Sequence, residues 1–100
     1  MIRIVKVTGE SLSPVYQEGD YVVITTIPFL LNKINVGDAV VFKHELYGMM
    51  IKKVTSVDEA QRTITVIGLH KDSIDSRNFG PVRRDALVGK VIWHVHKPNN

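Results

Sequence analysis

The sequence predicts a mostly β fold made of short antiparallel strands. Several short stretches are rich in valine, isoleucine and threonine, which fit the pleated surface of a sheet. A Gly-Asp pair interrupts the chain before two of these stretches, as expected of a turn that leads into a strand. No window of helical length shows apolar residues at a period of 3.6. With 100 residues, the chain has room for one hydrophobic core, so we expect residues 1–100 to form a single domain.

The predicted strands follow one another with mostly polar connections. They are the segments 2–7, 21–26, 39–43, 49–57, 62–68 and 86–96. The polar sequence DEAQ between the fourth and fifth segments predicts a hairpin. Two stretches fit neither a strand nor a short turn: residues 27–35, which are apolar but contain a proline, and residues 70–84, which are long and polar. Long ordered loops in small domains are often functional, so both are candidate site segments.

Composition and charge exclude several classes of function. The 13 Lys and Arg residues against 10 Asp and Glu give a net charge of only +3, without a basic stripe interleaved with aromatic residues, so we expect no nucleic-acid partner. The absence of cysteine rules out disulfides, thiolate metal sites and a cysteine nucleophile. No segment approaches the about 20 apolar residues of a membrane span. The chain as given is expected to be soluble and cytoplasmic, whereas an N-terminal anchor preceding it would make it extracytoplasmic and membrane-anchored.

The candidate nucleophile lies in the stretch GESLSP, residues 9–14. Ser11 and Ser13 stand on either side of Leu12, just before Pro14. A stiff turn of this kind would present a hydroxyl, and the residues alone leave open which of the two serines it is. A serine is a poor nucleophile unless a base lies within hydrogen-bond reach, so the chain must also supply a base.

Histidine held by a carboxylate is the usual base for a serine. The four histidines show no recognisable triad context in the sequence; they are His44, His70, His94 and His96. The last two share one face of a predicted strand, but no third metal ligand is visible near them. We therefore predict neither a metal site nor a cofactor.

A neutral lysine can act as the base instead. Its pKa of about 10.4 must fall by several units, and burial among apolar groups can achieve this. In the strand 49–57, alternation places Met50 and Val54 on the same side as Lys52. Lys52 is thus the candidate base, while Lys53 points to the opposite side and is free to be a charged partner.

Each of these features also has a simpler structural explanation. The two lysines can protect a strand edge from aggregation. The Ser-Pro sequence can be a plain turn. The sequence DSIDSR can be a loop cap with an ion pair between Asp75 and Arg77.

Taken together and in this order, the segments resemble the type I signal peptidase family (S26) and its relatives in the S24–S26 group, which use a serine–lysine dyad. The Ser-Met-x-Pro box of that family is matched by GESLSP, with leucine in the methionine position. Its Gly-Asp-x-Val-x-Phe and Lys-Arg-Val segments are matched by GDAVVFK and MIKKV. Its Ser-x-Asp-Ser-Arg-x-x-Gly-x-Val box is matched by SIDSRNFGPV, followed by VGKV. The match runs from about residue 7 to residue 91.

The resemblance implies a compact β fold of the kind shared by signal peptidases and self-cleaving repressors, and it assigns roles by position. Ser11 would be the nucleophile and Lys52 the general base. Ser73 would hydrogen-bond the lysine and orient it. An ion pair of Asp75 with Arg77 would support that loop. The implied activity is cleavage of an extended protein or peptide segment through an acyl-enzyme.

Further positions carry lesser roles. The backbone N–H of Ser11 would stabilise the oxyanion, and Gly9 could add only a backbone group. Leu12 and Pro14 would border the bound peptide. Lys53 stands where the family has an arginine, which loses the bidentate fork of the guanidinium.

The chain departs from the family in two further ways. The sequence Gly-Leu-His at 68–70 replaces the family's Gly-Asp-Asn, with one residue fewer before Ser73. Compared with long members, we expect a form without the membrane anchor and without the large inserted β-region. This form looks like the small soluble processing peptidases of the group, such as those that mature nickel superoxide dismutase.

Two other functions stay open. A catalytically inactive relative would bind peptides along its strand edges, and the altered sequence at 68–70 motivates this reading. A self-cleaving repressor-type domain would cut an Ala-Gly or Cys-Gly bond upstream of the serine, but only ten residues precede Ser11 and neither dipeptide occurs.

The apolar stretch IPFLL gives one further expectation about partners. Phe29, Leu30 and Leu31 would contact a membrane surface or line the substrate groove, because exposed apolar clusters usually mark contact sites. The alternative is that they cap the core beneath a loop.

Overall fold

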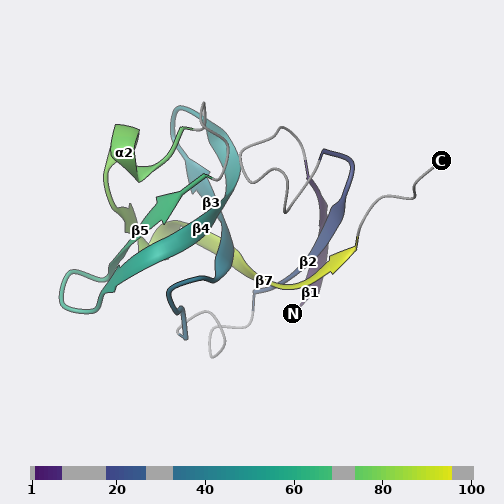
Figure 1. Cartoon of the computed structure of the whole chain (residues 1–100), viewed down its shortest axis with the longest axis horizontal. Coiled ribbons are helices and arrows are strands. Elements are labelled where there is room, and N and C mark those ends of the chain that lie inside the picture. The colour runs from purple at the N-terminus through teal and green to yellow at the C-terminus, as the bar shows by residue number, and fades with distance from the viewer. Residues whose placement is uncertain (1, 8–17, 27–32, 69–73, 96–100) are drawn as a thin grey trace.

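The seven strands found among the described residues form one antiparallel sheet. The computed structural model describes residues 2–7, 18–26, 33–68 and 74–95. The strands are β1 (Ile2–Lys6), β2 (Tyr21–Thr25), β3 (Ala39–His44), β4 (Gly48–Asp58), β5 (Thr63–Ile67), β6 (Val82–Arg83) and β7 (Leu87–Val95). Their order in the sheet is β1-β2-β7-β3-β4-β5-β6, so the last strand lies between β2 and β3. The predicted fold class, mostly β with short antiparallel strands, is confirmed (Figure 1).

The six predicted strands are all present, with ends that differ by a residue or two. β4 and β5 pair as the predicted hairpin, from Lys53 opposite Ile67 to Asp58 opposite Thr63. Gly19 and Gly37, in the two Gly-Asp turns, have φ of 92° and 97°. Glycine adopts this left-handed backbone without steric cost, which explains why a glycine stands at both turns.

Three short elements within or next to residues 70–84 were not predicted from the sequence. They are the helix α2 (Ser76–Phe79), the two-residue strand β6 and the 3₁₀ turn η1 (Arg84–Ala86). A helix of four residues is too short to produce an apolar period, and a two-residue strand cannot show alternation. The prediction of a long irregular loop is therefore corrected here.

The sheet buries apolar side chains on both faces. β3 shows why: Val40 and Phe42 point into one cluster, whereas Val41 between them points into the other. The first cluster comprises Ile34, Val40, Phe42, Val54, Ile64, Val66 and Val82. The second comprises Val7, Val22, Ile24 and Val41. Figure 1 shows the sheet strongly twisted, with β1 and β2 towards one end and β5 and α2 towards the other.

β7 connects the two ends of the sheet. It pairs with β2 on one side and with β3 on the other, and the register shifts between Val23 and Ile24 and between Val41 and Phe42. Gly89 of β7 lies so close to Ile24 that a Cβ there would stand 2.7 Å from the Cδ1 of that side chain. A glycine is thus needed where β7 crosses the second cluster.

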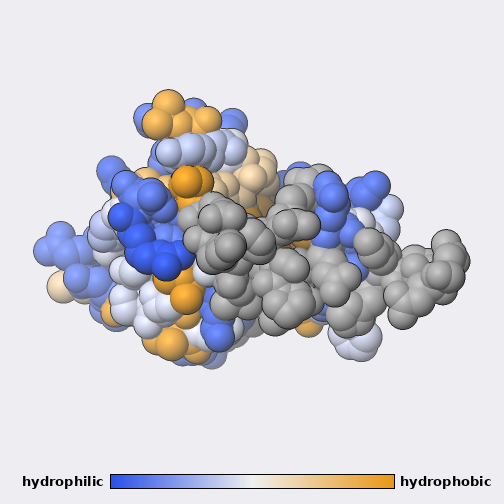
Figure 2. Space-filling model, turned by 45° about the horizontal axis from the view of Figure 1, so that its top comes forward, coloured by the Kyte–Doolittle hydropathy of each residue, from blue (hydrophilic) through white to orange (hydrophobic). Residues whose placement is uncertain are grey.

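The described surface mixes polar and apolar side chains. Figure 2 shows hydrophobic residues in several separate places on one face, with hydrophilic residues between them. Exposed apolar side chains include Leu46 and Tyr47 in the β3–β4 hairpin, and Ile4 and Trp93 on β1 and β7. Within the part of the chain that the structure describes, no helix is long and apolar enough to cross a membrane.

Candidate active site around Lys52

Lys52 is the only lysine among the fully buried side chains of the described residues, with a relative exposure of 1%. It lies in the middle of β4, opposite Val40 of β3. Met50 and Val54 lie on the same face of the strand and belong to or pack against the first core cluster. The alternation predicted from the sequence therefore holds, and the lysine stem is surrounded by apolar groups.

Burial controls the protonation of Lys52. Removing an ammonium group from water disfavours its charged form. This desolvation lowers the pKa of Lys52 below its ordinary value of 10.5, while the nearby Asp75 carboxylate raises it and the Arg77 guanidinium lowers it. The direction of the net shift is the one that a lysine base requires.

Among the charged groups, the buried Asp75 has the largest effect on the pKa of Lys52. Its carboxylate accepts hydrogen bonds from Arg77 Nε at 2.9 Å and Arg77 Nη2 at 2.7 Å, so the expected ion pair is present. The backbone N–H of Gly68 donates to Asp75 Oδ2 at 2.9 Å. The bond from the Arg77 side chain, together with the backbone donors, holds the pKa of Asp75 at about 2 in spite of its burial. Asp75 is therefore a carboxylate at neutral pH.

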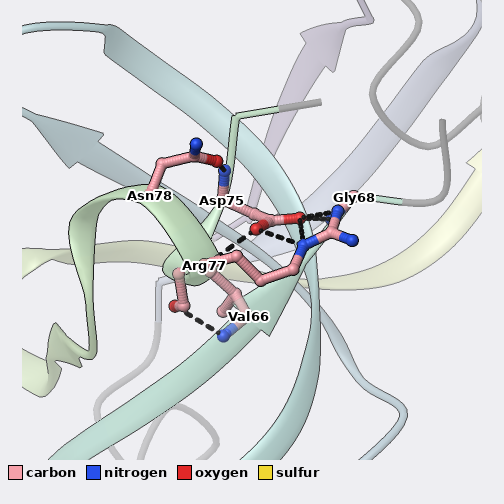
Figure 3. A network of polar contacts seen from close by, with 6 residues as sticks. Val66, Gly68, Asp75, Arg77 and Asn78 are labelled. Atoms are coloured by element: carbon pink, nitrogen blue, oxygen red, sulfur yellow. Dashed lines mark hydrogen bonds and ion pairs between the residues drawn. The ribbon is translucent and has the colours of Figure 1, made fainter. Parts of the chain in front are cut away.

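The local sequence explains how this carboxylate is fixed. Asp75 is the N-cap of α2: its side chain accepts the N–H of Arg77, and Asn78 completes a capping box by accepting the N–H of Asp75 (Figure 3). Such caps satisfy backbone donors that a helix start leaves unpaired. At the other end of α2, Phe79 packs edge-on against Phe42, with ring centroids 6.1 Å apart. The short helix is thus held to the first core cluster.

Other residues predicted for the site have different positions. Lys53 is exposed and lies on the opposite side of β4 from Lys52, so it faces away from the buried amine. The remaining predicted site residues lie outside the described residues; they are Gly9, Ser11, Leu12, Pro14 and Ser73. The same is true of Phe29, Leu30 and Leu31, so the expected membrane or groove contact stays a prediction.

The two ends of the segment that carries Ser11 are nevertheless described. The N–H of Val7 donates to the carbonyl of Asp20 at 2.7 Å, and the N–H of Gly19 donates to the carbonyl of Val7 at 3.0 Å. Val7 and the turn at Gly19 and Asp20, which flank this segment in the sequence, are therefore joined by a pair of backbone hydrogen bonds.

A histidine–carboxylate contact that the sequence did not reveal lies at this point. Asp20 is buried, with 1% exposure, and its Oδ2 stands 2.7 Å from Nε2 of His94 on β7. The second Gly-Asp turn is also bound by β7, since Lys90 Nζ lies 3.1 Å from Asp38 Oδ2. The two turns themselves were predicted from the sequences GDYVVI and GDAVVF. Their partners on β7 could not be found from them.

No group of three or more potential metal ligands occurs within residues 2–7, 18–26, 33–68 and 74–95. His94 is held by Asp20 in a side-chain pair, which is a structural role for one of the two histidines considered as metal ligands.

Comparison with known proteins identifies the family of this chain. A family model described as Peptidase S24-like matches residues 2–92. The chain belongs to this family. The match covers the Gly-Asp turns, Lys52 and the Asp75–Arg77 pair, and it supports the suspected S24–S26 relationship. No curated protein matches the chain. The family match by itself indicates a serine peptidase or a self-cleaving repressor-like domain.

Proposed function

We propose that this Peptidase S24-like chain is a serine endopeptidase of the signal-peptidase type, in which Ser11 is the nucleophile and Lys52 the general base. Its substrate is an extended segment of a protein or peptide. The observation that carries the proposal is the burial of Lys52 beside the Asp75–Arg77 ion pair, with the pKa of the amine lowered by desolvation. Burying a lysine costs folding free energy, and groups with a shifted pKa are found most often at functional sites. In the sequence, Lys52 stands where the family has the base of its serine–lysine dyad.

The proposed reaction has two steps. Neutral Lys52 takes the proton of the Ser11 hydroxyl while its oxygen bonds to the scissile carbonyl carbon. The tetrahedral intermediate then expels the amine of the leaving peptide, which takes the proton from the Lys52 ammonium, and an ester to Ser11 remains. Water attacks this ester, Lys52 takes a proton from the water, and the proton returns to Ser11 as the acid product leaves.

The charges around Lys52 suit both stages of this cycle. Desolvation favours the neutral amine before the attack, whereas the Asp75 carboxylate favours the ammonium that forms during it. Because Arg77 partly neutralises Asp75, the carboxylate does not hold the lysine permanently protonated. The balance between these groups is what a base near the operating pH requires.

The test uses a serine-directed acylating probe and intact-mass spectrometry. We expect one adduct in the wild type, none in Ser11→Ala, and a rate reduced by about 10³-fold or more in Lys52→Met, as for removal of a member of a catalytic unit. Lys43→Met is the matched control, because it changes an exposed lysine on the neighbouring strand. Equal labelling of wild type and Lys52→Met would contradict the proposal.

Family membership also favours a second candidate, which is cleavage of the chain's own polypeptide. Dilution separates the two reactions. Self-cleavage keeps the same half-life at every protein concentration and yields two fragments of this chain. Cleavage of an added peptide scales with enzyme concentration and leaves the chain intact. A stable complex with peptides that are never cut would favour the inactive, peptide-binding alternative.

A further inference from the structure

Ser76 belongs to the box SIDSR, but nothing in the proposed mechanism gives it a role. It is the first residue of α2 and directly follows the N-cap Asp75. Its hydroxyl oxygen accepts a hydrogen bond from the backbone N–H of Val66 at 2.9 Å, in a partly buried position. This bond joins the start of α2 to β5, the strand next to the one that carries Lys52.

The outer edge of β5 explains why such a bond is needed. Alternate residues of a strand point their N–H groups to the same edge. On this edge β6 pairs with Thr63 and Ile64 only, so the N–H groups of Val66 and Gly68 lie beyond its reach. Each is accepted by a side chain of the α2 region: Val66 by Ser76 and Gly68 by Asp75 (Figure 3).

Beyond the end of β6, two consecutive side chains, those of Asp75 and Ser76, therefore accept the outward N–H groups of β5 in place of a strand. Phe79 holds the end of α2 to the first core cluster. The two bonds, spaced two residues apart along β5, fix the position and orientation of its start. Because Lys53 pairs with Ile67, the next position along β5, Gly68, lies beside Lys52. Asp75 is therefore bound to β5 at the position opposite the residue that carries the buried amine.

We propose that Ser76 is a positioning residue of the Lys52 site, whose hydroxyl fixes the Asp75 carboxylate relative to the Lys52 amine. Its importance for catalysis rests on the proposed function, but the positioning itself does not. Ser76 touches neither the substrate nor the reacting atoms. It acts by setting the strength of the electrostatic interaction between the Asp75 carboxylate and the Lys52 amine.

The test measures that electrostatic coupling directly. The pKa of Lys52 is followed by NMR titration of the protein labelled with ¹³C at the lysine ε-carbon. Asp75→Asn keeps an N-capping side chain but removes the charge that raises the pKa of Lys52, so it should lower this pKa. We expect the same substitution to lower it less when Ser76→Ala is also present, and to recover its full effect with Ser76→Thr, which retains the hydroxyl.

An equal effect of Asp75→Asn with and without Ser76→Ala would overturn the proposal. Ser56→Ala, at an exposed position of β4, is the control and should leave the coupling unchanged. The NMR measurement needs no enzymatic activity. A reduced coupling together with a wild type that is never acylated would therefore support the positioning by Ser76 and contradict the proposed function.

Amide hydrogen exchange gives an independent check, and its wild-type arm does not require any variant to fold. Among the described strands, none pairs with Val66 on this edge, and its N–H donates to Ser76, so we expect its protection to depend on Ser76. We expect it to exchange slowly in the wild type and about fivefold or more faster in Ser76→Ala, the change expected for one lost hydrogen bond. Exchange of Val66 in the wild type as fast as at the exposed ends of the strands would overturn the proposal.

Discussion

Lys52 is the residue at which stability and the proposed function oppose each other. Its side chain is buried, with the charges of Asp75 and Arg77 nearby, and desolvation lowers the pKa of its amine. At any pH between this lowered pKa and 10.5 the unfolded chain binds more protons than the folded one, so stability should rise with pH across that interval. An apolar side chain would fill the same place in the core without this loss of stability at neutral pH.

The substitution Lys52→Met should therefore stabilise the protein while it abolishes acylation of Ser11. Methionine fills a similar volume without a charge, and replacing a buried charge by an apolar side chain is often stabilising. We expect the free energy of unfolding at pH 7 to increase by about 0.5–2 kcal/mol, measured by urea denaturation. A loss of stability larger than in the exposed control Lys43→Met would show that the amine has a structural role instead.

Asp75 should give the protein a defined sensitivity to acid. Its pKa is about 2 in the folded state against an ordinary value of 3.8, so its contribution to stability is complete above about pH 4 and is lost as the pH falls towards 2. The contribution is on the order of 2 kcal/mol. Urea denaturation at several pH values should show a shallower loss in Asp75→Asn than in the wild type. Identical slopes would contradict the buried ion pair.

At the scale of the elements, β7 is the strand that connects the two core clusters. It crosses the second cluster at Gly89, where a Cβ would meet the side chain of Ile24 at 2.7 Å and the backbone oxygen of Thr25 at 3.0 Å. We expect Gly89→Ala to reduce the free energy of unfolding by about 1–3 kcal/mol, because the backbone oxygen cannot move aside easily. The control Ser56→Ala should stay within about 0.5 kcal/mol of the wild type.

β7 also binds the turn that closes the segment containing Ser11, through His94 and the buried Asp20. His94→Ala removes one partner of a buried carboxylate and should reduce the free energy of unfolding by about 1–3 kcal/mol. His94→Gln, whose amide N–H₂ can still donate, should lose less. If thermal denaturation shows the same loss for both variants, the packing of the ring matters and the hydrogen bond does not.

At the scale of the whole molecule, the sequence predicts local structure well and long-range pairing poorly. The strands were found because β-branched residues and Gly-Asp turns act locally, and alternation alone placed Lys52 on an apolar face. The position of β7 between β2 and β3 could not be predicted, since strand order depends on contacts between distant parts of the chain. The His94–Asp20 contact joins residues 74 positions apart, and nothing in either local sequence announces it. The hydroxyl of Ser76 was missed for the same reason.

The sheet order also relates the two segments of the proposed Ser11–Lys52 site. The turn at which the Ser11 segment ends leads into β2, and Lys52 lies on β4. β7 and β3 separate these two strands in the sheet, and the twist of the sheet brings its ends out of one plane (Figure 1). The proposed site therefore depends on the complete sheet, and we expect peptide cleavage and the folded structure to be lost together in one transition on denaturation.

The central claim, that Lys52 is the base for Ser11, is tested most directly by the pH dependence of Ser11 acylation in the wild type and in Lys52→Met. We expect the wild-type rate to rise with an apparent pKa below the ordinary lysine value of 10.5, and this rise to disappear in Lys52→Met. A profile that is the same in both proteins, or that is lost in His94→Gln instead, would contradict the claim and would assign the proton transfer to another group.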